Sequence, residues 1–275
     1  MSAPDAEPFS RALELMNRFQ EPEAHALIAD LGLPAGSSGL DVGCGVGLYT
    51  LWLAEAVGPR GRVIGIEPSA ERVDEARALV GDRLPASRLE LREGDATKLD
   101  LADGTLDWVW CGDVLHHVQE TGRALGEFAR VVRPGGRIVV KESQFLHGLF
   151  LPGHPALERR LRQAETEFSR HEGGEYSFEE RRQRTLASMR PAGLVVESFR
   201  TYVVERRAPL PAGSRDYLQR VVFDRNWGPR LRDRLTADDW KERSALCDAG
   251  SPDLVLDDPD YYCFYPISVV TARRT

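Results

Sequence analysis

Three alternating glycines carry the clearest chemical signal in this sequence. The run Leu40-Asp41-Val42-Gly43-Cys44-Gly45-Val46-Gly47 ends an apolar segment, and a helical pattern follows it. Glycine lets the backbone approach a ligand without a Cβ in the way, and it tolerates the positive φ of a tight strand-to-helix turn. The run therefore predicts a nucleotide-binding turn, with Gly43 and Gly45 nearest the ligand.

The spacing of this turn separates two kinds of nucleotide. Asp41 stands two residues before the first glycine, and Leu48 stands where a dinucleotide fingerprint has its last glycine. The pattern is thus closer to ExGxGxG than to GxGxxG, which favours S-adenosylmethionine (SAM) over NAD. A dinucleotide site places a pyrophosphate at the helix N-terminus, whereas SAM has no phosphate and lies close to the turn's backbone.

Two acidic residues follow at the ends of the next predicted strands. The apolar run Arg62–Glu67 reads as a strand, and Pro68 follows it as a helix opens. An acid in the position of Glu67 accepts hydrogen bonds from ribose hydroxyls, in SAM and NAD alike. The alternating run 89–96 breaks at Asp95, whose carboxylate can accept from an adenine amino group while the Ala96 N–H donates to a ring nitrogen.

Two further strands are predicted over 106–113 and 133–142. The ordered blocks LDVGCGVG, VIGIEPS, EGDATKL, LDWVWCGDVLHHV and RVVRPGGRIVVKE lie within residues 40 to 142. In this order they resemble the class I SAM-dependent methyltransferases, most closely the group with the ubiquinone and menaquinone methyltransferases and many small-molecule methyltransferases. The resemblance implies an α/β fold: a Rossmann-like, seven-stranded, mostly parallel sheet with helices on both faces, an antiparallel last strand and helical lid insertions.

The resemblance also assigns cofactor-binding positions at the carboxyl ends of the first strands, where open α/β sheets bind ligands. The residues on the methionine side are Asp41, Gly43, Cys44, Gly45 and Gly47; those at the ribose are Glu67 and Pro68; those at the adenine are Asp95 and Ala96; and those at the methyl-donor end are Cys111, Gly112 and Asp113. The product is S-adenosylhomocysteine.

Methyl transfer from a sulfonium is an in-line displacement, and it needs a general base only when the acceptor must lose a proton. The candidates are His116, His117 and Asp113, just after the fourth strand. Neighbours diverge by about 100° around a helix, so only one of the two histidines can face the cleft. We prefer His116; the alternative is a capping or packing role for the pair.

The sequence on either side of this core predicts an N-terminal cap and two insertions. A helix over 8–31 has Phe9, Leu13, Met16 and Phe19 at helical spacing, a stripe suited to core packing and to closing over the cleft. Ser177 begins a capping-box-like helix start, and residues 267–273 read as a final antiparallel edge strand. The predicted segments are 1–31 (N-terminal helical cap), 32–142 (SAM-binding core), 143–176 (lid insertion), 177–206 (core helix and strand), 207–264 (substrate-side insertion) and 265–275 (final strand).

Aromatic residues gather in the second insertion. Tyr217, Trp227, Trp240 and the run 260–266 could line an apolar pocket for an aromatic or polyketide-like substrate. The alternative is that they pack the insertion onto the sheet.

Composition narrows the partners. Forty-three acidic against 36 basic residues give a net charge of −7, which argues against a nucleic-acid groove. Arg181, Arg182 and Arg184 are interpreted as the solvated face of a helix.

The four cysteines lack CxxC and metal-ligand spacing, so we expect reduced thiols and no metal. Neither a signal peptide nor an apolar span is recognised, which predicts a cytoplasmic protein without a membrane partner. The oligomeric state is open.

The sequence thus favours a SAM-dependent methyltransferase (EC 2.1.1.-) acting on O, N or C of a small molecule, such as a secondary metabolite. One alternative keeps the fold and SAM but catalyses a non-methylating cyclisation or rearrangement. A NAD-dependent oxidoreductase is a second alternative, disfavoured by Leu48. A pure binding module is a third, disfavoured because every expected contact position holds a competent residue.

Overall fold

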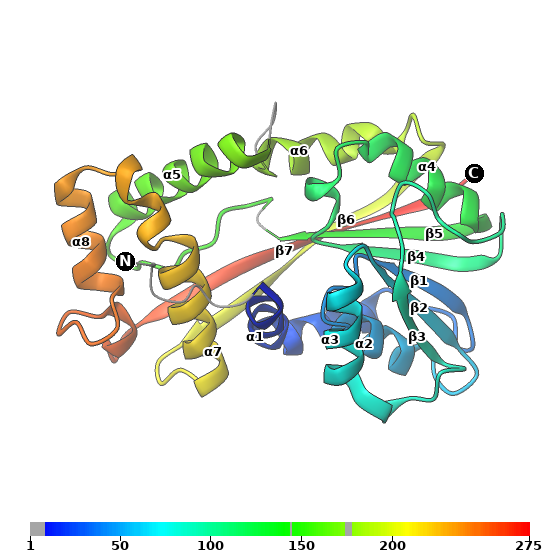
Figure 1. The fold of residues 1–275 in the computed structure, drawn as a ribbon, viewed down its shortest axis with the longest axis horizontal. Coiled ribbons are helices and arrows are strands. Elements are labelled where there is room, and N and C mark those ends of the chain that lie inside the picture. The colour runs from blue at the N-terminus through cyan, green and yellow to red at the C-terminus, as the bar shows by residue number, and fades with distance from the viewer. Residues whose placement is uncertain (1–8, 144, 174–177) are drawn as a thin grey trace. The chain divides into compact units, whose positions relative to one another are not determined.

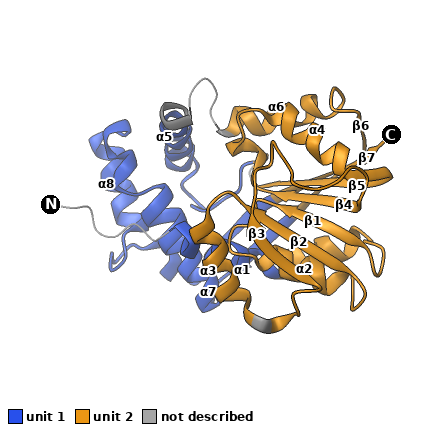
Figure 2. Cartoon of the chain, turned by 45° about the vertical axis from the view of Figure 1, so that its right-hand side comes forward, with its two compact units in different colours: residues 1–21, 147–178, 203–266 blue, residues 22–146, 179–202, 267–275 orange. Residues whose placement is uncertain are grey.

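A computed structural model describes residues 9–143, 145–173 and 178–275 of the chain. The chain divides into two compact units (Figure 2). Unit 1 comprises Met1–Glu21, His147–Phe178 and Val203–Pro266, and unit 2 comprises Pro22–Leu146, Glu179–Tyr202 and Ile267–Thr275.

A seven-stranded sheet of order β3-β2-β1-β4-β5-β7-β6 runs through the described residues (Figure 1). Strands β1 to β5 are parallel, and β7 runs antiparallel to β5. The bounds are β1 Ser38–Val42, β2 Arg62–Glu67, β3 Leu89–Glu93, β4 Leu106–Gly112, β5 Val132–Ser143, β6 Leu194–Arg207 and β7 Tyr262–Arg274. The predicted fold class is confirmed, including its antiparallel last strand.

The last strand is not an edge strand, however, so that part of the prediction is wrong. Strand β7 lies between β5 and β6, and β6 is the outer strand. The reason is visible in burial: Val270 and Ala272 in β7 are fully buried, whereas Val195 and Phe199 in β6 are about half exposed. The continuous burial of β7 shows that both of its faces are covered, as in an inner strand, and the sheet order gives it β5 and β6 as neighbours.

Helices cover both faces of the sheet in unit 2. Helices α2 (Leu48–Ala56) and α3 (Ala70–Val80) lie on one face, and α4 (Thr121–Val131) and α6 (Phe178–Met189) lie on the other (Figures 1 and 2). Helix α4 buries Ala124, Leu125, Phe128 and Val131, one face at helical spacing, in the same core cluster as Ile138 of β5. The predicted capping residue Ser177 lies outside the described residues.

Helix α1 (Phe9–Asp30) closely matches the predicted N-terminal helix. Its buried stripe matches the predicted one only in part, because Phe19 is buried as predicted but Phe9 is not. Leu15 and Phe19 are buried, whereas Phe9 is 46% exposed and Met16 is only partly buried. The spacing of apolar residues predicts the helix, but residue types alone do not fix which of its faces is covered.

Unit 1 has a core of its own. Its elements are α5 (Pro155–Gly173), α7 (Ala212–Asp216), the π-helix η3 (Tyr217–Asn226), the 3₁₀ helices η4 (Pro229–Arg234) and η5 (Val255–Asp257), and α8 (Ala237–Cys247). Tyr217 stacks on Phe19 with ring centroids 4.4 Å apart. Tyr217, Trp227 and Tyr265 are each at most 3% exposed. These three aromatic residues therefore belong to the core of unit 1. No helix in the described ranges is long and apolar enough to cross a membrane.

Candidate functional site

The glycine turn leaves the end of β1 and enters α2 in a conformation that favours glycine. Gly43, Gly45 and Gly47 have φ of 71°, 53° and 80°. The N–H groups of Gly43 and Cys44 both donate to the Ile66 carbonyl of β2, at 2.8 and 2.9 Å. A Cβ added to Gly43 would lie 2.3 Å from a methyl group of Val114. Any side chain here would therefore displace the loop that follows β4.

Asp41 connects β1 to the helix that follows the turn. Its side chain is buried and accepts a hydrogen bond of 2.6 Å from the Thr50 hydroxyl of α2. Burial raises the pKa of Asp41 to about 7. This hydrogen bond thus joins the end of β1 to α2.

Glu67 ties the turn to the second strand. Its side chain, at the end of β2, accepts from the Gly45 N–H at 3.2 Å and from Arg72 Nε at 2.7 Å. Pro68 follows directly, and the Ser69 hydroxyl caps α3 by accepting from the Arg72 N–H. Glu67 is only 5% exposed, so its carboxylate is held in one place beside Gly45.

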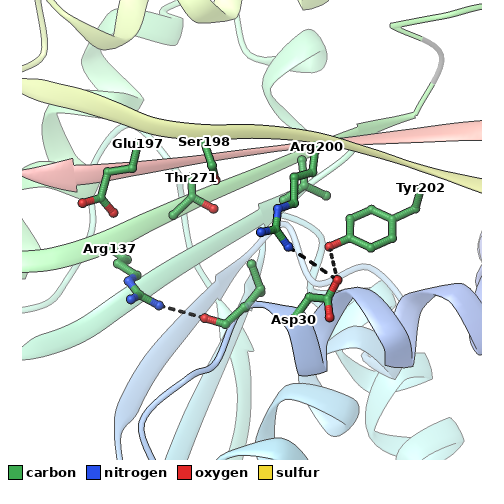
Figure 3. A pocket seen from close by; sticks show the side chains of 9 residues that line it. Asp30, Arg137, Glu197, Ser198, Arg200, Tyr202 and Thr271 are labelled. Carbon is green, nitrogen blue, oxygen red and sulfur yellow. Dashed lines mark hydrogen bonds and ion pairs between the residues drawn. The ribbon is translucent and has the colours of Figure 1, made fainter.

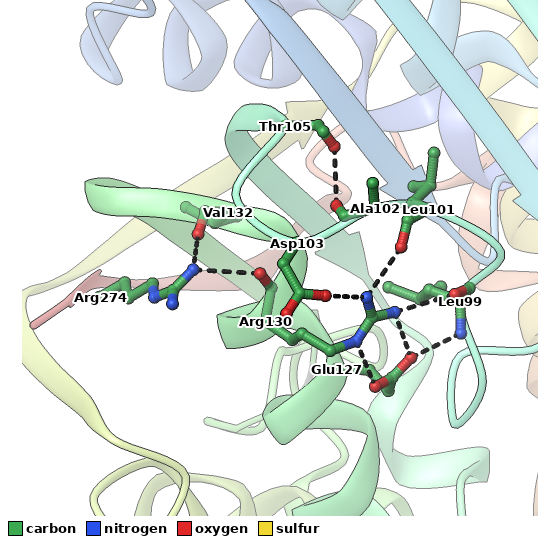
Figure 4. Close-up of polar contacts among 9 residues, drawn as sticks. All are labelled: Leu99, Leu101, Ala102, Asp103, Thr105, Glu127, Arg130, Val132 and Arg274. Carbon is green, nitrogen blue, oxygen red and sulfur yellow. Dashed lines mark hydrogen bonds and ion pairs between the residues drawn. The ribbon is translucent and has the colours of Figure 1, made fainter.

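Asp95 and Ala96 follow β3. Asp95 is exposed, and its Oδ1 accepts from the Thr97 N–H and hydroxyl at 2.7 and 2.8 Å. These hydrogen bonds lower the pKa of Asp95, which keeps it ionised. The segment after Ala96 is anchored by Arg130 of α4, which donates to the Leu99 and Leu101 carbonyls and pairs with Asp103 and Glu127 (Figure 4).

The end of β4 places two predicted residues, Cys111 and Asp113, in different surroundings. The Cys111 side chain is fully buried in the sheet core, so only its backbone can reach a ligand. Asp113 has a φ of 57°, forms an ion pair with Lys141 and accepts from the Ser143 N–H at 2.6 Å. Burial alone would raise the pKa of Asp113, but the charge of Lys141 and the hydrogen bonds from Lys141 and Ser143 together outweigh burial and lower this pKa to about 2.

The two histidines lie in the short 3₁₀ helix η2 (Leu115–His117) and differ in exposure. His116 is 4% exposed; its Nδ1 lies 2.7 Å from Glu142 Oε2, and its Nε2 lies 3.3 Å from Nη2 of Arg182. His117 is exposed, with its ring centroid 4.1 Å from that of His116. His116 is thus held in a buried polar network, whereas the His117 side chain is exposed.

Glu142 and Arg182 were not predicted as site residues. Glu142 closes the predicted fifth strand with an acid, a signal that could have identified it. Arg182 gave no such signal, and its interpretation as a solvated residue is wrong: its side chain is 13% exposed and lies 3.4 Å from Glu142. Arg184, by contrast, is exposed as expected.

The sheet brings the ends of the first four strands together. Val42, the last residue of β1, is in register with Ile66 of β2 and Cys111 of β4. The glycine turn, Glu67 and the 111–117 segment therefore leave neighbouring strands at one edge, and Asp95 follows β3, the next strand outward.

A separate hollow lies beside Arg137 of β5. It has a volume of about 270 Å³ and is lined by residues of α1, β5, β6 and β7 (Figure 3). Its polar groups bind one another: Asp30 accepts from Tyr202 at 3.0 Å and lies 3.6 Å from Arg200, and Arg137 donates to the Leu31 carbonyl. It contains none of the predicted site residues.

Comparison with known proteins identifies a domain over the first five strands. Residues 40–140 match the family model described as a methyltransferase domain. A demethylmenaquinone methyltransferase of Bacillus cereus is 38% identical over 108 residues, 39% of this chain and 45% of that protein. The matched segments span between 30% and 56% of the curated relatives' lengths.

Two solved structures share the fold over nearly the whole chain. The [4+2]-cyclase SpnF has a TM-score of 0.58 at 19% identity and covers 98% of this chain and 95% of its own. Geranyl diphosphate C-methyltransferase from Streptomyces coelicolor, in complex with S-adenosyl-L-homocysteine, has a TM-score of 0.55 at 17% identity and covers 98% and 88%.

Proposed function

We propose that this chain, whose residues 40–140 form a class I SAM-dependent methyltransferase domain, transfers a methyl group from SAM to O, N or C of a small-molecule acceptor. The observation that carries the proposal is the glycine turn fastened to Glu67. The turn presents backbone without side chains next to a fixed carboxylate, at the sheet edge where such folds bind their ligands.

The residues of this edge fit SAM. At Gly43 the absence of a Cβ lets Val114 pack against the backbone, which holds the loop after β4 on the turn. Glu67 is proposed to accept from the ribose hydroxyls with lone pairs that Gly45 and Arg72 leave free, since a carboxylate offers about four acceptor sites. Asp95 and the Ala96 N–H are proposed to hold the adenine. Bound SAM would supply an electrophilic methyl carbon to the acceptor.

The first experiment is calorimetric titration with SAM, S-adenosylhomocysteine and NADH, after mass spectrometry has shown the sample to be free of nucleotide. We expect micromolar binding of the two sulfur nucleotides and none of NADH. Glu67→Ala is expected to weaken SAM binding about tenfold or more, because it removes a charged hydrogen-bond acceptor worth about 1.5–3 kcal/mol. Binding of NADH alone would overturn the proposal.

A second candidate is a non-methylating cyclisation on the same fold. Its supporting observation is the similarity to SpnF, which extends over both inserted regions. Incubation with SAM carrying a labelled methyl group distinguishes the two. Transfer of label to an acceptor supports methylation, whereas conversion of an acceptor with no mass change and no loss of SAM supports cyclisation.

A further inference from the structure

The outer strand β6 exposes apolar side chains on both of its faces. Between the buried Leu194 and Val204, every residue of the strand is exposed or partly exposed. Val195 and Phe199 are four residues apart and therefore point to the same face, where they are 54% and 48% exposed. Val196 points to the other face and is 44% exposed. An edge strand with such side chains is a template for pairing with another chain.

The outer edge of β6 is open to another strand. The sheet order places no strand beyond β6 in the part of the chain that the structure describes. Natural edge strands are commonly blocked by proline, by a bulge or by an inward-pointing charge. The segment 194–204 contains no proline, and its two charged side chains have partners within unit 2: Glu197 lies 2.6 Å from Arg273 Nε, and Arg200 Nη1 lies 3.6 Å from Asp30. A strand that adds to this edge therefore meets no unpaired charge.

The residue types of β6 are symmetric about Phe199. Outward from this residue, each side has two polar residues and then three apolar or aromatic ones: Ser198, Glu197, Val196, Val195 and Leu194 on one side, and Arg200, Thr201, Tyr202, Val203 and Val204 on the other. A two-fold axis that pairs two copies of a strand in antiparallel fashion places each residue opposite the one at equal distance from the axis. The sequence of β6 thus has the symmetry that a strand needs in order to pair with itself.

An axis at Phe199 matches side chains on both faces of the paired strands. On one face it places Phe199 opposite Phe199 and Val195 opposite Val203, and on the other it places Val196 opposite Tyr202. Cross-strand pairs of aromatic and β-branched residues stabilise sheets. Pairing over 194–204 forms about ten backbone hydrogen bonds, because every second pair of opposite residues exchanges two. This is the number found in a typical interface between proteins.

Neighbouring positions of the axis give poorer pairs. An axis at Arg200 places two arginine side chains directly opposite each other, and like charges in that arrangement destabilise a sheet. An axis at Ser198 places Glu197 opposite Phe199 and Val196 opposite Arg200, so two apolar side chains lose their apolar partners. The residues of β6 therefore favour one register, centred on Phe199.

We propose that two copies of this chain associate through β6, antiparallel about an axis at Phe199, so that their two sheets become one continuous sheet. The occupant of the edge is a second copy because the pattern of β6 is complementary to itself. Strands β4, β5 and β7 separate β6 from β1 and β2, which carry the glycine turn and Glu67. The association therefore requires no bound SAM and goes beyond the proposed function.

The test is sedimentation velocity of the full, ligand-free chain at concentrations up to about 100 μM, above the weak end of affinities for interfaces of standard size. We expect a reversible dimer. Phe199→Lys places two ammonium groups opposite each other and should raise the Kd of the dimer at least about tenfold, and Phe199→Glu should do the same with two carboxylates. The matched control is Phe9→Lys, which makes the same change at a phenylalanine of α1 that is 46% exposed and should leave the Kd unchanged. Circular dichroism verifies that each variant is folded.

An equimolar mixture of Phe199→Lys and Phe199→Glu tests the register. An axis at residue 199 places the lysine opposite the glutamate, so the mixture should dimerise at least about tenfold more tightly than either variant alone. A monomer at about 100 μM overturns the inference, as does a dimer whose Kd is unchanged by Phe199→Lys. Loss of the dimer in both variants without recovery in the mixture contradicts the pairing about Phe199. None of these results depends on SAM binding or methyl transfer, so the proposed function is tested separately.

Discussion

Replacing Gly43 with alanine tests whether the glycine turn is shaped by close approach of the loop after β4. The φ of Gly43 is 71°, and a Cβ there would lie 2.3 Å from Val114 Cγ2. A left-handed conformation costs an alanine about 1–2 kcal/mol. The steric overlap adds about 1–3 kcal/mol, typical of overpacking. We therefore expect Gly43→Ala to reduce the free energy of unfolding by about 2–5 kcal/mol.

Gly58 provides the matched control. Its φ is 74°, but a Cβ at this position would meet nothing within 4 Å. Gly58→Ala should therefore cost only the conformational part, about 1–2 kcal/mol. The difference between the two variants isolates the contact with Val114.

The assay is urea unfolding followed by circular dichroism, with the free energy taken from midpoint and slope. In a Val114→Ala background, most of the excess cost of Gly43→Ala over Gly58→Ala should disappear, because both overlapping methyl groups are gone and only the Cβ of residue 114, at 3.1 Å, remains close. SAM affinity should fall at least about tenfold in Gly43→Ala and stay unchanged in Gly58→Ala. Equal costs for the two glycine variants in the native background would refute the reasoning.

Two further predictions concern charged residues of unit 2. Because the pKa of Asp113 is lowered to about 2 from 3.8, its ionised form contributes stability above about pH 4, about 2 kcal/mol, and this is lost as the pH falls toward 2. Asp113→Asn should flatten that part of the stability–pH curve measured by urea unfolding, and an unchanged acid limb would contradict it. Arg130→Met should reduce the free energy of unfolding by about 1–3 kcal/mol, since the Leu99 and Leu101 carbonyls lose their donor. The exposed Arg123→Met is the control, and equal effects of the two would count against the anchoring role.

The sequence predicted the strands of the parallel half closely because their signals are local. The predicted strand 62–67 coincides with β2, and β1 ends at Val42, directly before the glycine turn. Apolar runs between glycine-rich turns fix such boundaries without any knowledge of neighbours. The position of β7 was beyond this reasoning, because the order of the last two strands depends on which one pairs with β5 and not on the residues of the strand itself.

Local sequence patterns likewise predicted only part of the candidate site. The glycine turn and Glu67 follow strand ends, and their spacing is a local pattern. The partners of His116 lie 26 and 66 residues away, and only the packing of β5 and α6 in unit 2 brings them to the ring. An arginine in a charged run is usually solvated, so the sequence favoured the wrong environment for Arg182.

The proposed role of Glu67 at the ribose leads to a last prediction. Its two oxygens already accept from Gly45 and Arg72, so the ribose hydroxyls of the proposed complex would share the carboxylate with both donors. The Gly45 contact is part of the turn and moves with it. The Arg72 side chain is 31% exposed and is able to rotate toward solvent. Arg72→Ala should therefore leave the turn intact and free one oxygen of Glu67, with a smaller effect on SAM affinity than Glu67→Ala; calorimetry showing the reverse order would place the ribose on Arg72 instead.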